Sequence, residues 1–416
     1  MLENKKLLIL GANPETAVLV NTAKSMGIYT IVTDYIPDSY AKKIADKAYD
    51  IDGLNVDELV AVAKEEKVDG VIVGTADPLI PSYYQVCQKL HLPCYCTEEA
   101  VMAFTNKIEF KKVCNMFGVQ GVPEYSIEDV WKDKVNYPIL VKPSDGRSGK
   151  GMSVCFSKEE VEPAVQKALA ASRCKTYLLE RYMECDDVFM YYTFIDGKYY
   201  LSAMSDRFTS KEQKGMDPVV LGAVYPSKYI ELYQNTLHEK MCQVFQYLNI
   251  RNGVLLIQAF VENDQFYVYD PGFRLQGAAP HILLENINHF DQQKMLIQLA
   301  LTGKMGDDIE EKNDVYFQGK IAASQVVLLK GGVIKKITGI EEVSGFPGVI
   351  KTTQRLFVGD EVSLIGTEQQ ILVRFHLVCE TKDQLKSLVD KINHTVSATD
   401  SNDNHMCLQG LQPKWI

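Results

Sequence analysis

The sequence predicts a chain of mixed class, α/β at its N-terminus and α+β beyond it. Three observations lead to this prediction. The first part of the chain alternates short apolar strands with helices, which is typical of βαβ units and a parallel sheet. The middle carries long aromatic strands joined by hairpin turns, which indicates an antiparallel sheet. The last part is rich in strands and in Gly-Gly and Gly-Asp turns, with one helix near Lys382–Ile392.

The amino-acid composition is that of a globular protein, and it argues against some classes of function. The 416 residues suffice for two or three domains, and 46% of them are hydrophobic. A net charge of −10 argues against a broad nucleic-acid-binding face, and no apolar run approaches the ~18–20 residues of a membrane span. The 10 cysteines are scattered and no secretion signal precedes them, so we expect reduced thiols and a cytoplasmic protein.

The N-terminal segment is expected to form a small doubly wound domain. Its expected strands are Lys6–Leu10, Ile28–Thr33, Gly70–Gly74 and Leu92–Tyr95, and its expected helices include Val56–Glu66 and Pro78–Leu90. Asp34 lies where a carboxylate holds a ribose in dinucleotide-binding domains, but the Gly-x-Gly-x-x-Gly fingerprint is absent. We therefore favour a turn role for Asp34 and rank an NAD-dependent oxidoreductase as the weakest hypothesis.

Further along, the expected elements follow one another without a repeat. They are a helix over Phe110–Phe117, strands at Tyr137–Lys142 and Met152–Phe156, a helix at Lys158–Ala171, a strand at Tyr177–Glu180, hairpin turns at Ile195–Lys198 and Glu262–Asp264, a helix at Glu285–Leu301, and a linker at Gly303–Asn313.

The segment Pro138–Met152 is the most informative part of the sequence. A strand delivers Lys142, and the following loop presents Gly146, Gly149 and Gly151. Glycines let backbone N–H groups approach phosphate oxygens closely, while a lysine on a strand supplies a fixed positive charge. The spacing is not that of a Walker loop. The segment predicts phosphate binding, and a plain hairpin turn is the alternative.

Two further segments carry residues suited to a nucleotide site. Tyr177–Asp187 passes from an apolar run into acidic residues, which could serve an adenine and a ribose or form a solvated strand end. Farther on, two antiparallel strands would bring Gln258 and Asp270 together as oxygen donors for Mg²⁺. Arg274 is placed to neutralise a transferring phosphoryl group, with a surface Asp–Arg pair as the alternative.

In this order and spacing, the three segments resemble the ATP-grasp superfamily, most closely its carbamoyl-phosphate-synthase-like, biotin-carboxylase-like and amino-acid-ligase-like branches. The resemblance implies a Rossmann-like pre-ATP-grasp domain over residues 1–100 and a β-rich C-terminal domain over 314–416. Between them it implies a two-lobed ATP-grasp domain over 101–305, with a flexible lid at about 113–182. ATP and Mg²⁺, or Mn²⁺, are the implied cofactors.

The resemblance also assigns roles to individual residues. Lys142 and Arg274 match the positively charged catalytic residues of the family, and Gln258 and Asp270 fall at its metal-ligand positions. The residues that match ATP-binding positions are Lys107, Lys142, Arg147, Ser148, Gly149, Gly151, Glu180, Arg181, Met183 and Asp187. The candidates for substrate contact, with a solvated loop role as the alternative for the first four, are Asn13, Asp77, Arg207, Lys214 and Arg274.

The implied reaction joins a small carboxylate to an amine through an acyl phosphate, with release of ADP and phosphate. Gly272 stands where the family has an Asn that holds a second metal, and Asp187 is shorter than the usual Glu on the ribose. These departures keep two alternatives open: a bicarbonate-phosphorylating enzyme of the carbamoyl-phosphate-synthase or biotin-carboxylase kind, and a nucleotide-binding protein without efficient catalysis. We expect a homodimer as the default assembly.

Overall fold

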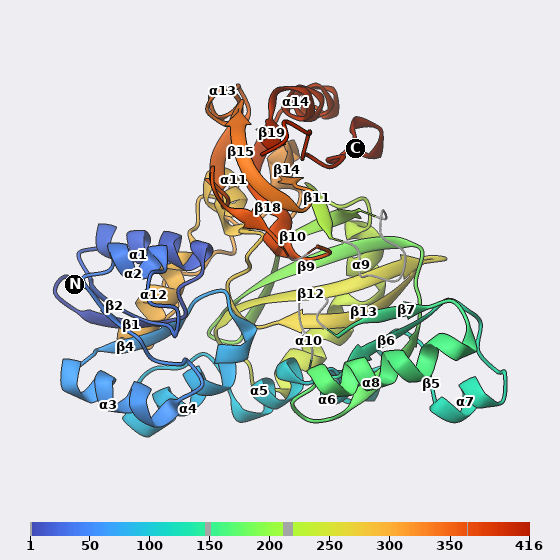
Figure 1. Ribbon diagram of the computed structural model, residues 1–416. Helices are drawn as coiled ribbons and strands as arrows, with labels where there is room; N and C mark the ends of the chain where they lie inside the picture. The colour runs from blue at the N-terminus through green and yellow to red at the C-terminus, as the bar shows by residue number, and fades with distance from the viewer. Residues whose placement is uncertain (1, 146–150, 211–218, 364) are drawn as a thin grey trace.

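The computed structural model describes residues 2–145, 151–210, 219–363 and 365–416 (Figure 1). The N-terminal elements, in blue, lie beside the green and yellow central elements, and the orange and red C-terminal elements stand above both (Figure 1). Within the described residues the strands form a parallel four-stranded sheet, an antiparallel four-stranded sheet, an eight-stranded sheet and a three-stranded sheet. The mixed α/β and α+β prediction is confirmed. None of the helices in these ranges has the length and apolar character needed to cross a bilayer.

The N-terminal domain is built on a parallel sheet with the strand order β3-β2-β1-β4. Strands β1 and β4 are buried along almost their whole length because helices cover both faces, as is usual for parallel sheets. Asp34 accepts hydrogen bonds from the backbone N–H groups of Ala12 (2.9 Å) and Ile36 (2.8 Å), so it has the predicted turn role. The elements are β1 (Lys6–Leu10), α1 (Pro14–Ser25), β2 (Tyr29–Thr33), α2 (Tyr40–Ile44), β3 (Lys47–Tyr49), α3 (Val56–Glu66), β4 (Gly70–Val73), the 3₁₀ turn Asp77–Leu79, α4 (Ile80–Leu90) and α5 (Glu98–Thr105).

The strand expected at Leu92–Tyr95 is wrong, because this segment is irregular in the structure. Pro93 has no N–H to offer a ladder, and the N–H of Tyr95 donates to the Tyr83 hydroxyl at 3.3 Å instead. The ring of Tyr95 packs at 5.0 Å from both Tyr83 and Phe273. The apolar residues that suggested a strand therefore join the N-terminal domain to the centre of the molecule.

A small antiparallel sheet in the order β5-β8-β6-β7 follows the first domain. Helix α8 covers this sheet through Val161, Ala164, Val165 and Ala168, which share one helix face and are all buried. The elements of this unit are α6 (Lys107–Met116), β5 (Glu124–Tyr125), α7 (Ile127–Trp131), β6 (Ile139–Pro143), β7 (Ser153–Cys155), the 3₁₀ turn Lys158–Glu160, α8 (Val161–Ala171) and β8 (Tyr177–Arg181).

The largest sheet runs in the order β13-β12-β9-β10-β11-β14-β18-β16. The predicted hairpin turns are confirmed: Asp196 and Gly197, like Asn263 and Asp264, adopt the positive φ of two-residue hairpin loops. Its strands are β9 (Asp186–Ile195), β10 (Lys198–Thr209), β11 (Val220–Tyr225), β12 (Gly253–Glu262), β13 (Gln265–Gly272), β14 (Ile321–Leu328), β16 (Val349–Gln354) and β18 (Ile371–Cys379). The helices near it are α9 (Ile230–Thr236), α10 (His238–Tyr247), α11 (His281–Asn288) and α12 (Gln292–Thr302), with a 3₁₀ turn at Phe317–Gly319.

The single helix expected at Glu285–Leu301 is two helices in the structure. His289 takes a left-handed conformation, with φ 57°, and ends α11. The Asp291 side chain then accepts from the backbone N–H of Gln293 at 2.8 Å and starts α12. The apolar periodicity runs through both helices and so suggested one, but the left-handed residue and the new helix cap divide the segment into two.

The eight-stranded sheet continues from the centre of the chain into the C-terminal part, because β11 pairs with β14, with Ala223 opposite Ser324. One face of this sheet can therefore bring residues from both parts together. The remaining C-terminal elements are a three-stranded sheet of β15 (Gly332–Thr338), β17 (Glu361–Val362) and β19 (Ser397–Asp400), helices α13 (Ile340–Ser344) and α14 (Lys382–Thr395), and the 3₁₀ turns Glu368–Gln370 and Pro413–Trp415.

Candidate active site

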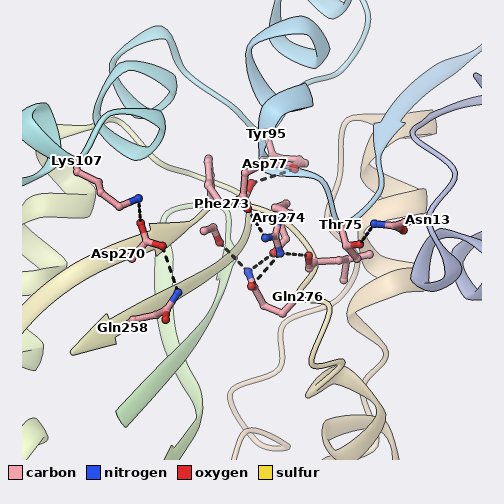
Figure 2. Close-up of polar contacts among 12 residues, drawn as sticks. Asn13, Thr75, Asp77, Tyr95, Lys107, Gln258, Asp270, Phe273, Arg274 and Gln276 are labelled. Carbon is pink, nitrogen blue, oxygen red and sulfur yellow. Dashed lines mark hydrogen bonds and ion pairs between the residues drawn. The ribbon is translucent and has the colours of Figure 1, made fainter. Parts of the chain in front are cut away.

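The predicted oxygen-donor pair lies side by side on strands β12 and β13. Gln258 and Asp270 are register partners, and the Gln258 amide Nε2 lies 3.5 Å from Asp270 Oδ2 (Figure 2). The hydroxyl of Tyr269 donates to Gln258 Oε1 at 3.0 Å. Carboxylate and amide oxygens are hard donors that suit Mg²⁺. The residues therefore fit such an ion, and their role as metal ligands stays a prediction.

Lys107 reaches the same carboxylate from the N-terminus of α6. Its Nζ lies 2.6 Å from Asp270 Oδ1, and its backbone N–H donates to the carbonyl of Ser144 at 3.1 Å (Figure 2). Asn106 caps the helix by accepting from the N–H of Ile108 at 2.9 Å. The cap fixes where the helix begins and so places the lysine against β13.

Lys142 belongs to a buried cluster of two lysines and one glutamate. Its Nζ lies 2.6 Å from Glu180 Oε2, and the Nζ of Lys111 lies 2.5 Å from Glu180 Oε1. Burial alone would raise the pKa of the Glu180 carboxyl, but the two ammonium groups outweigh burial and hold that pKa below its usual range. Sequence reasoning missed Lys111, although it lies one helical turn after Lys107.

The predicted phosphate loop is described only at its ends. Arg147, Ser148 and Gly149 lie outside the described residues. Gly151 has φ +81°, and a Cβ there would lie 2.5 Å from the Ala171 Cβ, so this position requires glycine.

Arg181 and Met183, two of the predicted ATP-binding residues, lie at and just after the end of β8, a segment here called the hinge. They contact each other, and Arg181 also contacts strand β12. The Arg181 guanidinium pairs with Glu262 at 2.5 Å, and its Nε lies 3.1 Å from the sulfur of Met183. Met183 is buried. The hinge is therefore attached to the large sheet through Arg181.

Asp187, predicted to contact the ribose of ATP, and Arg207, predicted to contact the substrate, form an ion pair with each other. Arg207 Nη1 lies 2.7 Å from Asp187 Oδ2, and the Tyr269 hydroxyl donates to Asp187 Oδ1 at 3.1 Å. Asp187 and Arg207 are register partners on β9 and β10, which explains the contact. The predicted ribose and carboxylate contacts would both compete with this ion pair. Lys214 lies outside the described residues.

Arg274 connects the large sheet to the N-terminal domain. Its Nη2 forms an ion pair with Asp77, and its Nη1 donates to the carbonyl of Leu275 at 2.7 Å and to Gln276 Oε1 at 3.0 Å (Figure 2). A Cβ at Gly272 would lie 3.2 Å from Gln276 Nε2 and 3.6 Å from Asp77 Oδ1. Gln276 and Asp77 therefore take up part of the space of a side chain at 272.

Asn13 is engaged within its own domain. Its Oδ1 caps α1 by accepting from the N–H of Thr16 at 2.9 Å. Its Nδ2 donates to Thr75 Oγ1 at 2.6 Å (Figure 2). The helix cap occupies Oδ1 and the contact with Thr75 occupies Nδ2, so both polar atoms of this side chain have partners.

A pocket lies where these elements meet. It is lined by Asp77, Phe104, Thr105, Lys107, Asp145, Asp270 and Pro271. Its walls come from the N-terminal domain, from α5 and α6, and from β13. The structure thus brings Asp77, Lys107 and Asp270 around one opening, with Gln258 and Arg274 beside it.

Comparison with known proteins finds a family whose model matches this region. Residues 106–307 match the family described as carbamoyl-phosphate synthase L chain, ATP binding domain. A formate-dependent phosphoribosylglycinamide formyltransferase of Sulfurisphaera tokodaii is 27% identical over 213 residues, 47% of this chain and 51% of that protein. The carbamoyl phosphate synthase large chain of Thermotoga petrophila is 22% identical over 306 residues, 67% of this chain and 27% of that protein. The chain thus spans about half the length of the first of these relatives and about a quarter of the second.

Solved structures show the same fold over nearly the whole chain. An L-amino acid ligase from Bacillus licheniformis superposes with a TM-score of 0.80 at 16% identity, covering 96% of this chain and 100% of that one. The biotin carboxylase domain dimer of 2-oxoglutarate carboxylase from Hydrogenobacter thermophilus, in complex with MgADP and bicarbonate, gives 0.74 at 17% identity and covers 97% and 91%. The chain therefore has the fold of these structures, and the predicted resemblance to the ATP-grasp superfamily is confirmed.

Proposed function

We propose that this chain is an ATP-dependent carboxylate–amine ligase that works through an acyl phosphate. The observation that carries the proposal is the convergence of Lys107, Asp270, Gln258 and Arg274 on one end of the large sheet, next to a pocket. Opposite charges from separate elements meet there. Such an arrangement suits phosphoryl transfer, in which positioning and charge neutralisation dominate and no side-chain nucleophile is needed.

Each residue has a distinct task in the proposed reaction. Lys107 and Lys142 hold phosphate oxygens of ATP, and the Arg274 guanidinium neutralises charge on the transferring γ-phosphoryl group. Gln258 and Asp270 would hold Mg²⁺, which supplies further charge neutralisation on the phosphates when it is bound. The substrate carboxylate attacks the γ-phosphorus and ADP leaves. An amine then attacks the acyl carbon and releases phosphate.

We expect two ion pairs to rearrange when ATP binds. Lys142 is paired with Glu180 and Lys107 with Asp270, so phosphate oxygens must share or replace these carboxylates. Glu180 keeps Lys111 as a second partner, which leaves Lys142 able to turn towards a phosphate without leaving the carboxylate unpaired.

The test is ADP release with Mg·ATP and pools of amino acids and other small carboxylates, each with and without bicarbonate. We expect release only when an organic pool is present. Release with bicarbonate alone would assign the chain to carboxyphosphate formation. Measurable ATP binding with no release in any pool would favour a nucleotide-binding protein, with Gly272 as the reason. A homodimer and a cytoplasmic location remain further proposals.

A further inference from the structure

Within the described residues, a buried guanidinium on the C-terminal side of the large sheet has no carboxylate in direct contact with it. Arg374 of β18 is 7% exposed, and its Nη1 donates to the carbonyl of Gly277. Among the described residues nothing accepts from its Nε. The carboxylates of Glu15 and Glu368 are close enough to act on its charge, but neither forms an ion pair with it. Burying an unpaired charge is costly, so a buried arginine in this state indicates an anionic ligand.

Arg355 lies close to Arg374. Arg355 follows β16 directly, and its backbone N–H donates to the carbonyl of Leu372 on β18 at 2.8 Å, two residues before Arg374. Burial lowers the pKa of Arg374, and the two guanidinium groups are close enough that the charge of Arg355 lowers that pKa further. Arg355 Nη1 lies 3.6 Å from Glu15 Oε1 and 3.8 Å from Glu368 Oε2, and it has no hydrogen-bond partner in the described part of the chain. Charge-assisted hydrogen bonds are typically about 2.7–2.9 Å long, so these two contacts are too long to be such bonds and leave N–H donors of Arg355 without an acceptor.

Glu15 brings a negative charge to the same place from the N-terminal domain. It lies in the first turn of α1, and its side chain is 12% exposed. Within the described ranges its carboxylate has the loose contact with Arg355 and no hydrogen bond. Two guanidinium groups and one carboxylate, all nearly buried and incompletely paired, therefore face one another between two parts of the chain.

The two histidines nearby add no charge at neutral pH. Burial lowers the pKa of His376 to about 3 and that of His281 to about 4. The Nδ1 atoms of both rings lack partners among the described residues. A ligand here would consequently meet two fixed cations, the carboxylate of Glu15 and several neutral polar atoms, with the more exposed Glu368 beside Arg355.

We propose that Arg374, Arg355 and Glu15 bind an α-amino acid, with the guanidinium groups on its carboxylate and Glu15 on its ammonium group. This inference rests on the proposed ligase function and names the class of one of its substrates. The site is tied to the phosphoryl-transfer residues by the loop after Arg274. Arg374 donates to the carbonyl of Gly277, and His376 Nε2 lies 3.0 Å from the carbonyl of Ala278.

The test measures binding of single amino acids to the full chain by calorimetry, in the presence of Mg²⁺ and a non-hydrolysable ATP analogue. Each amino acid is compared with its N-acetyl form, which lacks the ammonium group, and with its α-amide, which lacks the carboxylate. We expect at least one amino acid to bind, and both modified forms to bind about 30-fold more weakly or worse. Equal binding of the three forms, or binding of none, would overturn the proposal.

Variants assign each contact. Arg374→Met should weaken binding of the amino acid about 30-fold or more, and it should leave the affinity for the α-amide, which is already low, unchanged. Glu15→Gln should weaken binding of the amino acid and leave the affinity for the N-acetyl form unchanged. Lys335→Gln, which breaks an exposed contact with Asp403 at 2.9 Å, is the control and should change nothing. If Arg374→Met does not fold, Arg355→Gln replaces it with the same expectation. Unaltered amino acid affinity in the variants would refute the site.

The outcomes separate this site from the proposed function. ADP release is measured in parallel with carboxylates that carry no amine. Release that is unaffected by Arg374→Met and Glu15→Gln with every substrate would keep the ligase and reject the amino acid site. Amino acid binding that obeys these expectations without ADP release from any substrate would keep the site and reject the ligase.

Discussion

Replacing Lys142 by alanine is expected to reduce ADP formation by about 10²–10³-fold, the usual cost of one preorganised charge at a phosphoryl-transfer site. The ammonium group is nearly buried and held on strand β6, so water cannot take its place easily. Glu180 keeps Lys111 as a partner, so we expect a loss of only about 1–3 kcal/mol in unfolding free energy. Coupled ADP assays and urea denaturation measure the two effects.

Lys111→Met is the matched control for this prediction. It removes the other ammonium group on Glu180, together with its contacts to Glu124 and to the Val122 carbonyl, so its effect on stability should be at least as large. Lys111 has no proposed contact with ATP, and turnover should change by less than about tenfold. Equal losses of turnover in both variants would make Lys142 a structural residue. Wild-type turnover in Lys142→Ala would remove it from the site altogether.

Replacing Arg274 by alanine is expected to lower kcat by about 10²–10³-fold with a smaller change in the KM for ATP, because its charge acts on the phosphoryl group in transit. The same change breaks the ion pair with Asp77, which joins the N-terminal domain to the large sheet. Steady-state kinetics of the variant, at saturating Mg²⁺, measure the effect.

Asp77→Asn separates the two consequences. It removes the ion pair and keeps the guanidinium, so kcat should fall less than in Arg274→Ala if the arginine acts on the phosphoryl group. The double variant should then resemble Arg274→Ala. A loss in Asp77→Asn as large as that in Arg274→Ala would show that the contact between domains is the important feature.

The parts of this structure that were predictable from sequence depend on local chemistry. Turn residues at Asp196-Gly197 and Asn263-Asp264 fixed two hairpins, and the second hairpin set the register as far as Ala259 opposite Val268. A register shift between Gln258 and Ala259, which no turn residue indicates, then places Gln258 opposite Asp270. Apolar periodicity located helices such as α3 and α8 in the same way. These signals lie within a few residues of the elements they specify.

The parts that were not predictable depend on contacts between distant segments. Lys111 and Glu180 lie 69 residues apart in sequence, and no local pattern shows that they share a buried ion pair. The Asp77–Arg274 pair spans 197 residues. The continuation of the large sheet through β14 likewise follows from pairing between segments about a hundred residues apart. Such partners become visible only once the chain is folded.

The central claim, phosphorylation of a carboxylate, is tested most directly by isotope transfer. The enzyme would be given Mg·ATP, its amine, and the active carboxylate labelled with ¹⁸O, and the released phosphate would be analysed by mass spectrometry. Attack of the carboxylate on the γ-phosphorus predicts one ¹⁸O atom in each phosphate formed during ligation. Ligation with unlabelled phosphate would contradict the acyl-phosphate route.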